Sequence, residues 1–220
     1  MAAQEVGRAG PGRPRRFAPD EERRLIMDAA VTVMQRVGYQ AATIDEILAE
    51  STVSRRAFYR HFDSKDALLV DLLRRDAESV TRTLRARVEA TDDAAGAVRA
   101  WIDGYLSLFL ERHRMRRVEV LSSEGAVQAA GYAAELAEIE RILVAPLAEA
   151  LRTGAAAGQV RSADPQTDAL TVMAVAAAIC GFPMRRLRPR DVPVYRAAIM
   201  RWCGPALGLA DDRDDPTDTI

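Results

Sequence analysis

Two adjacent arginines, Arg55 and Arg56, follow Ser54 at the start of a short segment that ends with Tyr59, Arg60 and His61. A guanidinium group presents its N–H donors as a planar fork, and this fork matches the O6 and N7 acceptors that guanine exposes in the major groove. Hydroxyl and cationic groups suit phosphate oxygens, which fix register without carrying sequence information. These residue types are therefore typical of a surface that contacts duplex DNA, if a helix presents them together.

Local capping signals predict such a helix and a second one before it. Thr43-Ile44-Asp45-Glu46 fits a capping box that opens a short helix to about Glu50, and Ser54 is a cap for a helix through Arg60. Two short helices joined by a tight turn form a helix-turn-helix, in which residues early in the second helix face base edges. Arg55 and Arg56 occupy those early positions. We therefore expect a helix-turn-helix over 43–60.

Helical periodicity continues along most of the chain, and strand alternation is nearly missing, so we predict an all-α fold. A helix is expected from Pro19 to Gly38, and a long one from Asp63-Ser64 toward Val88 should link two units. Pro146 should kink or end a later helix, and 154–158 should be a loop. The expected organisation is a flexible arginine-rich arm (1–19), a DNA-binding domain (20–65), a helical effector-binding and dimerisation domain (66–210) and an acidic disordered tail (211–220).

Residues 38–47 (GYQAATIDEI) and 53–69 (VSRRAFYRHFDSKDALL) resemble the TetR family of bacterial transcriptional regulators. The resemblance covers about 20–70 and implies a three-helix DNA-binding domain, followed by a larger helical domain with a ligand pocket and a homodimer built by the last two helices. It implies phosphate contacts for Thr43, Tyr59 and Lys65, and base contacts for Arg55 and Arg56. This sequence departs from the family where Ser51-Thr52 replaces the usual Ala-Gly of the turn and where Arg56 replaces a frequent glycine.

Each predicted contact also has a purely structural interpretation. The full set of expected DNA-contacting residues is Thr43, Ser54, Arg55, Arg56, Tyr59, His61, Lys65, Arg13 and Arg15. The two arginines of the helix could be solvated surface charges, Tyr59 could cover the domain core, and His61 could be a packing residue. Arg13 and Arg15 surround a proline in a segment that suits the narrow minor groove of A·T-rich DNA, but a flexible solubilising tail has the same composition.

Two further groups of residues are expected in the larger domain. Aromatic and apolar side chains at helical spacing could line a pocket for a small, largely apolar effector, although such stripes are more often ordinary core: Trp101, Tyr105, Phe109, Tyr132, Leu136 and Phe182. Apolar residues of the last two predicted helices could pack against a second copy of the chain: Met173, Ala177, Tyr195, Ile199 and Trp202.

The remaining sequence features argue against other classes of protein. No metalloprotease, phosphate-loop or nucleophile-elbow motif is present, so no catalytic residue, cofactor or metal site is expected. Cys180 and Cys203 lie apart in apolar segments and are expected to be buried free thiols. No membrane span or secretory signal is evident, which predicts a cytoplasmic protein. A repressor of a palindromic operator is the favoured interpretation; a DNA-binding activator or architectural protein is the alternative, and a helical small-molecule binding protein or enzyme is a remote one.

Overall fold

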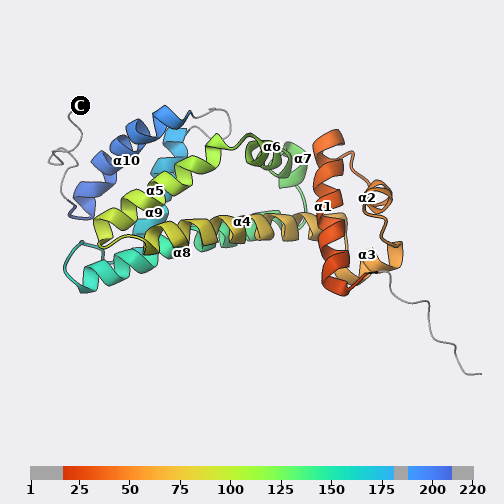
Figure 1. Ribbon diagram of the computed structural model, residues 1–220, viewed down its shortest axis with the longest axis horizontal. Helices are drawn as coiled ribbons and strands as arrows, with labels where there is room; N and C mark the ends of the chain where they lie inside the picture. Colours follow the sequence, from red (N-terminus) through yellow and green to blue (C-terminus); the bar gives the residue numbers. More distant parts are fainter. Residues whose placement is uncertain (1–16, 181–187, 210–220) are drawn as a thin grey trace, which may run out of the picture.

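The computed structural model describes residues 17–180 and 188–209, so Arg13, Arg15 and Phe182 lie outside the described residues. The described residues form α-helices and two short 3₁₀ helices, with no strand among them, which confirms the all-α prediction. Figure 1 shows an elongated arrangement, with three N-terminal helices at one end and the last two helices at the other. No helix in the described ranges is both long and apolar enough to cross a membrane.

The three N-terminal helices are α1 (Pro19–Val37), α2 (Ile44–Ser51) and α3 (Arg55–His61). α1 begins with a proline at its first position and three acidic residues in its first turn, both of which favour a helix N-terminus. The inner faces of the three helices share one core with the start of the next helix. Its fully buried members include Ile26, Val33, Ile47, Phe58 and Leu69.

Two long helices, α4 (Lys65–Glu89) and α8 (Tyr132–Ala156), connect the ends of the molecule. Arg74 is hydrogen-bonded to Glu135 near one end of this pair, and Arg85 to Glu149 near the other. The two helices therefore run side by side in the same direction, which gives the larger domain a continuous spine.

The second core lies at the far end of this spine. It combines the later halves of α4 and α8 with α5 (Ala94–Ser107), α9 (Pro165–Cys180) and α10 (Val192–Ala206), which the 3₁₀ helix η2 (Pro189–Asp191) precedes. Trp101 is fully buried at its centre and donates its indole N–H to the Leu143 carbonyl over 3.1 Å. Cys203 is a buried free cysteine, and burial raises the pKa of its thiol.

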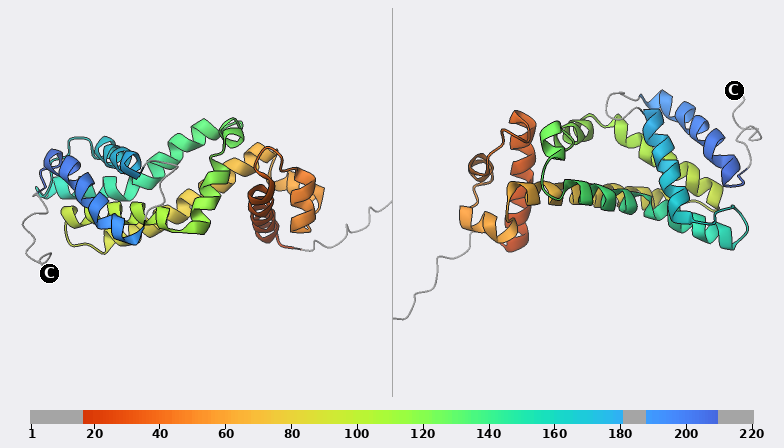
Figure 2. Two further views of the ribbon diagram at one scale, coloured as in Figure 1. Left: turned by 90° about the horizontal axis from the view of Figure 1, so that it is seen from above. Right: turned by 180° about the vertical axis from the view of Figure 1, so that it is seen from behind.

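The segment between α5 and α8 brings the chain back to the N-terminal helices. It contains the 3₁₀ helix η1 (Leu108–Leu110), α6 (Arg112–Leu121) and α7 (Glu124–Val127), and Figure 2 shows α6 and α7 beside α1. Leu121 and Ala126 are buried in the same core as α1–α3. The larger domain thus completes the core formed by α1–α3.

α8 does not end at Pro146 but continues to Ala156, so the predicted loop at 154–158 is wrong for its first three residues and begins only at Ala157. Proline lacks the N–H that would bond the carbonyl four residues earlier. The Thr81 hydroxyl of α4 lies 3.4 Å from that carbonyl, on Ile142, and offers it a donor. Gly154 packs so closely on α5 that a Cβ there would lie 2.5 Å from the Cβ of Ala94. Contacts from α4 and α5 therefore stabilise α8 at the proline and the glycine, two residues that disfavour a helix interior.

Candidate nucleic-acid interface

α3 presents one apolar face to the core and one polar face to solvent. The Ser54 hydroxyl accepts the Ala57 backbone N–H over 3.2 Å, which confirms the predicted N-cap. Ala57 and Phe58 are buried, whereas Arg55, Arg56 and Tyr59 are exposed. At 100° per residue these three exposed side chains fall on one side of the helix. The chain thus displays two guanidinium groups and a phenol on a single helical face.

The turn before α3 contains Thr52 in the left-handed conformation, at φ 56° and ψ 20°. No other non-glycine residue of the described chain has a positive φ. The Ser51 hydroxyl lies 3.4 Å from the Val53 N–H and the same distance from the Leu48 carbonyl, which holds the turn from within. The turn therefore places a β-branched residue in the left-handed region, at a strain of about 1 kcal/mol.

Arg55 is paired with an anion on the preceding helix. Its guanidinium forms an ion pair with Asp45 of α2, and both side chains remain more than half exposed. Exposed pairs are worth only about 0–1 kcal/mol because water screens them. A nucleic-acid acceptor could therefore replace Asp45 at small cost.

Thr43 forms the predicted capping box at the start of α2. Its hydroxyl accepts the Glu46 N–H over 3.2 Å, and its own N–H donates to Glu46 Oε2 over 3.0 Å. The pKa of Glu46 is lowered by the hydrogen bonds from the Thr43 side chain and backbone. Thr43 is exposed, so its hydroxyl lies at the surface beside the N-terminus of a helix.

Lys65, the first residue of α4, has a structural role in this state. Its ammonium donates to the carbonyls of Tyr39, Gln40 and Ala42 over 2.9, 3.2 and 2.9 Å. It also lies 4.5 Å from the centre of the Tyr39 ring. An ammonium has three donors. A phosphate contact by Lys65 would therefore require one of these carbonyls to be released.

His61 and Arg60 converge on Glu22 of α1. Arg60 donates to Glu22 Oε2 over 2.6 Å, and Nε2 of His61 lies 3.2 Å from the same oxygen. The imidazole side chain is only 11% exposed. His61 is therefore packed between α3 and α1, in agreement with its structural interpretation, and sequence reasoning gave no sign of Glu22 because 39 residues separate the two.

The predicted effector-binding residues do not form one group. Trp101 stacks on Tyr105 with ring centres 5.1 Å apart, and Tyr105 meets Phe109 edge-on at 5.6 Å. Tyr132 belongs instead to the core beneath α1–α3, and Leu136 is 43% exposed on α8. The helical spacing that suggested a single aromatic lining thus divides between two cores.

A cleft of about 370 Å³ lies at the far end of the molecule, between the ends of α4 and α8 and the start of α5. None of the described effector candidates lines it; its walls include Arg85, Glu89, Asp93, Ala97 and Thr153. Arg85 and Glu149 form an ion pair at 2.9 Å on its wall, beside apolar residues such as Val88 and Pro146. Sequence periodicity does not reveal it, since it arises only where three helix ends meet.

The predicted dimer residues divide in the same way. Met173 and Ile199 are buried in the second core, and Ala177 and Tyr195 are half-buried. Trp202 is 75% exposed and Val194 is 67% exposed on α10. The surface of α10 thus carries two exposed apolar side chains, of which Trp202 belongs to the predicted set.

Residues 26–72 match the family model described as bacterial regulatory proteins, tetR family. Over 102 residues the chain is 32% identical to the HTH-type transcriptional activator FasR of Mycolicibacterium smegmatis, a match that covers 46% of each protein. The A-factor receptor protein of Streptomyces griseus is 47% identical over 45 residues, which cover 20% of this chain and 16% of that protein. The matches thus span less than half of the length of these curated relatives.

Solved structures extend the likeness to most of the chain. GusR of Salmonella enterica superposes with a TM-score of 0.69 at 18% identity, covering 88% of this chain and 98% of that one. FadR of Bacillus subtilis, solved in complex with stearoyl-CoA, gives 0.64 at 16% identity over 82% and 97% of the two chains. The family match places the helix-turn-helix region, residues 26–72, in the tetR family of bacterial regulatory proteins, and the solved structures show that the helical domain behind it has the same fold.

Proposed function

We propose that the protein is a homodimeric transcriptional regulator that acts in the cytoplasm and inserts α3 into the major groove of a palindromic operator. The observation that carries this proposal is the exposed face of Arg55, Arg56 and Tyr59 on a capped helix whose other face is fixed in a core. A rigid helix is needed because base readout requires donors at fixed positions.

The proposed contacts follow from the chemistry of each group. Arg55 and Arg56 read guanines, and Thr43, Ser54 and Tyr59 hold phosphates on either side of the groove. Lys65 and His61 join this set only by giving up their contacts with the 39–42 carbonyls and with Glu22. Arg13 and Arg15 enter the adjacent minor groove, where arginine favours narrow A·T-rich segments.

The proposed dimer uses the outer faces of α9 and α10. The exposure of Trp202 and Val194 supports this assignment, because large apolar groups are usually covered at subunit interfaces. A two-fold axis there would present two copies of α3 to half-sites about 34–36 Å apart.

Regulation is proposed to occur through a small, largely apolar effector that binds the larger domain and releases operator DNA. The B. subtilis FadR structure was solved with stearoyl-CoA, and the long acyl chain of that ligand supports an effector with an apolar part. To change the protein from mostly DNA-bound to mostly DNA-free, the effector must bind the state that does not bind DNA more tightly than the other state, by about 5.5 kcal/mol. The second candidate function is activation, which the match to the activator FasR favours.

Selection of duplexes from a random library by the full-length protein tests the DNA-binding proposal. We expect enrichment of a palindromic sequence, which we call the selected duplex, over a scrambled duplex of the same composition. The affinity for the selected duplex should fall with salt at a logarithmic slope of about −0.9 per phosphate contacted. A library that emerges with no enriched sequence would exclude specific operator binding.

The direction of regulation needs a separate measurement. Transcription from a promoter that carries the selected duplex should decrease when the protein is added, if the protein is a repressor. An increase would assign it to the activator alternative, without affecting the DNA-binding proposal.

A further inference from the structure

A single buried carboxylate of α1 holds two consecutive residues of α3. Oxygen Oε2 of Glu22 accepts from the guanidinium of Arg60 over 2.6 Å and lies 3.2 Å from Nε2 of His61. The Glu22 side chain is only 7% exposed, and His61 only 11%. The contact lies at the C-terminal end of α3, while the exposed face of Arg55, Arg56 and Tyr59 lies on its solvent side.

Glu22 is stabilised in its ionised form at this buried place. Burial by itself would raise the pKa of Glu22, but the hydrogen bonds from Arg60 and His61 outweigh it and lower the pKa below its ordinary value. Glu22 also lies in the first turn of α1, where the helix dipole favours a carboxylate. The negative charge therefore persists at neutral pH although the site is shielded from water.

The other inward-facing contacts of α3 are apolar or involve an aromatic ring. Ala57, Phe58 and Phe62 supply apolar packing, and Arg23 of α1 lies 5.5 Å from the centre of the Phe62 ring. Apolar packing is nondirectional, whereas charged hydrogen bonds depend on geometry. Two such bonds from neighbouring residues 100° apart on the helix restrain rotation about the helix axis as well as its distance from α1.

We propose that Glu22 is the positioning residue of α3: it fixes the rotation of this helix and thereby aims Arg55 and Arg56 at base edges. This inference rests on the proposed DNA-binding function. It adds Glu22, which is not among the expected DNA-contacting residues. Glu22 itself touches no base, and it acts through Arg60 and His61. Buried ion pairs add little net stability relative to apolar packing, and fixing a register is their best-attested role.

The test uses Glu22→Gln in the full-length protein, with Glu21→Gln as its matched control. Both substitutions remove one carboxylate from the first turn of α1, but Glu21 is exposed. Loss of a negative charge near DNA alone should strengthen binding slightly and equally on every duplex. If Glu22 positions α3, Glu22→Gln should instead weaken binding to the selected duplex. Thermal melting of each variant sets a temperature at which all of them are folded.

We expect Glu22→Gln to weaken binding to the selected duplex by about tenfold, and to change binding to the scrambled duplex by less than about twofold. In an Arg60→Gln, His61→Gln background the same substitution should change neither affinity by more than about twofold, since its partners are already gone. Equal weakening on both duplexes would reduce Glu22 to a stabilising residue and overturn the inference. Behaviour identical to Glu21→Gln would also overturn it. If the wild-type protein enriches no duplex, the proposed function fails first, and the inference fails with it.

Discussion

Arg55 already has an anionic partner in the free protein. In the free protein its guanidinium pairs with Asp45, and both groups are exposed to solvent. The pair keeps the arginine close to the α2–α3 surface, and under the proposed function DNA binding would exchange the carboxylate for a guanine edge. Because screened pairs are weak, this exchange lowers the affinity for DNA only slightly.

Asp45→Asn should therefore strengthen binding to the selected duplex by about threefold, since Arg55 no longer has to leave a charged partner. Fluorescence anisotropy titration of a labelled duplex measures this. Glu50→Gln is the control, because it removes one carboxylate from the same helix without touching Arg55. An equal gain in both variants would show that the effect is general electrostatics and that the Arg55–Asp45 pair does not compete with DNA.

The turn between α2 and α3 illustrates how an element can keep its geometry with an unfavourable residue. Thr52 takes positive φ although it is β-branched, because the capped helices on either side determine the path of the chain. Its side chain is exposed, so no packing compensates for the strain.

Thr52→Gly should raise the free energy of unfolding by about 0.5–1 kcal/mol, since glycine adopts this conformation without strain and its greater freedom in the unfolded chain offsets only part of the gain. Urea unfolding monitored by circular dichroism measures the difference. Thr32→Gly in the middle of α1 is the matched control, also at an exposed threonine, and should destabilise by about 0.3–0.5 kcal/mol, the difference between two poor helix formers. Destabilisation by Thr52→Gly would mean that the turn carries no strain.

Local hydrogen bonds explain why these elements could be predicted from the sequence. The caps at Thr43, Ser54 and Ser64 join residues three apart, so their partners can be read directly from the chain. The exposed faces of short helices follow from periodicity in the same way.

Partners distant in sequence could not be predicted. Tyr132 shares its helical spacing with core aromatics but lies in the other core, because α8 starts beside the DNA-binding helices. The donors of Lys65 are directed to carbonyls 23–26 residues away. Residue type indicates what a group can bond, whereas only the tertiary arrangement determines which acceptor it reaches.

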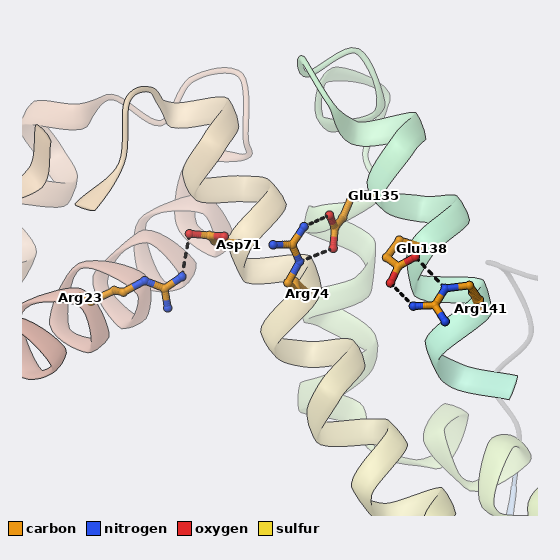
Figure 3. Close-up of polar contacts among 6 residues, drawn as sticks. All are labelled: Arg23, Asp71, Arg74, Glu135, Glu138 and Arg141. Atoms are coloured by element: carbon orange, nitrogen blue, oxygen red, sulfur yellow. Dashed lines mark hydrogen bonds and ion pairs between the residues drawn. The ribbon is translucent and has the colours of Figure 1, made fainter. Parts of the chain in front are cut away.

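On the scale of the whole molecule, α4 connects the DNA-binding helices with the larger domain. Arg23 of α1 pairs with Asp71 over 2.7 Å, and one helical turn later Arg74 forms two hydrogen bonds with the buried Glu135 of α8, as Figure 3 shows. Asp66 accepts both the Tyr39 hydroxyl and, over 2.9 Å, the Ala130 backbone N–H that precedes α8. A shift of α8 relative to α4 would thus be transmitted through Asp66 to Tyr39, in the loop that leads to Thr43.

This junction should be sensitive to acid. The hydrogen bond from Tyr39 and that from the Ala130 N–H lower the pKa of Asp66, so its contribution to stability is complete above the ordinary pKa of about 3.9 and is lost as pH falls through the folded value. Asp66→Asn should cost about 1–2 kcal/mol at pH 7 and less at pH 3, as measured by urea unfolding at both pH values. Asp63→Asn, which changes an exposed carboxylate nearby, is the control. An equal cost of Asp66→Asn at both pH values would contradict the charge-dependent junction.

The central claim is that α3 reads bases through its two arginines, and repeating the DNA selection with Arg55→Ala and Arg56→Ala tests it most directly. Arg36→Ala, at an exposed arginine of α1, is the control. We expect each α3 variant to lose preference at particular base pairs and to lose about 1–3 kcal/mol of binding free energy on the selected duplex. The control should keep the wild-type preference. An unchanged preference in both α3 variants, with the same loss of affinity on every duplex, would contradict it.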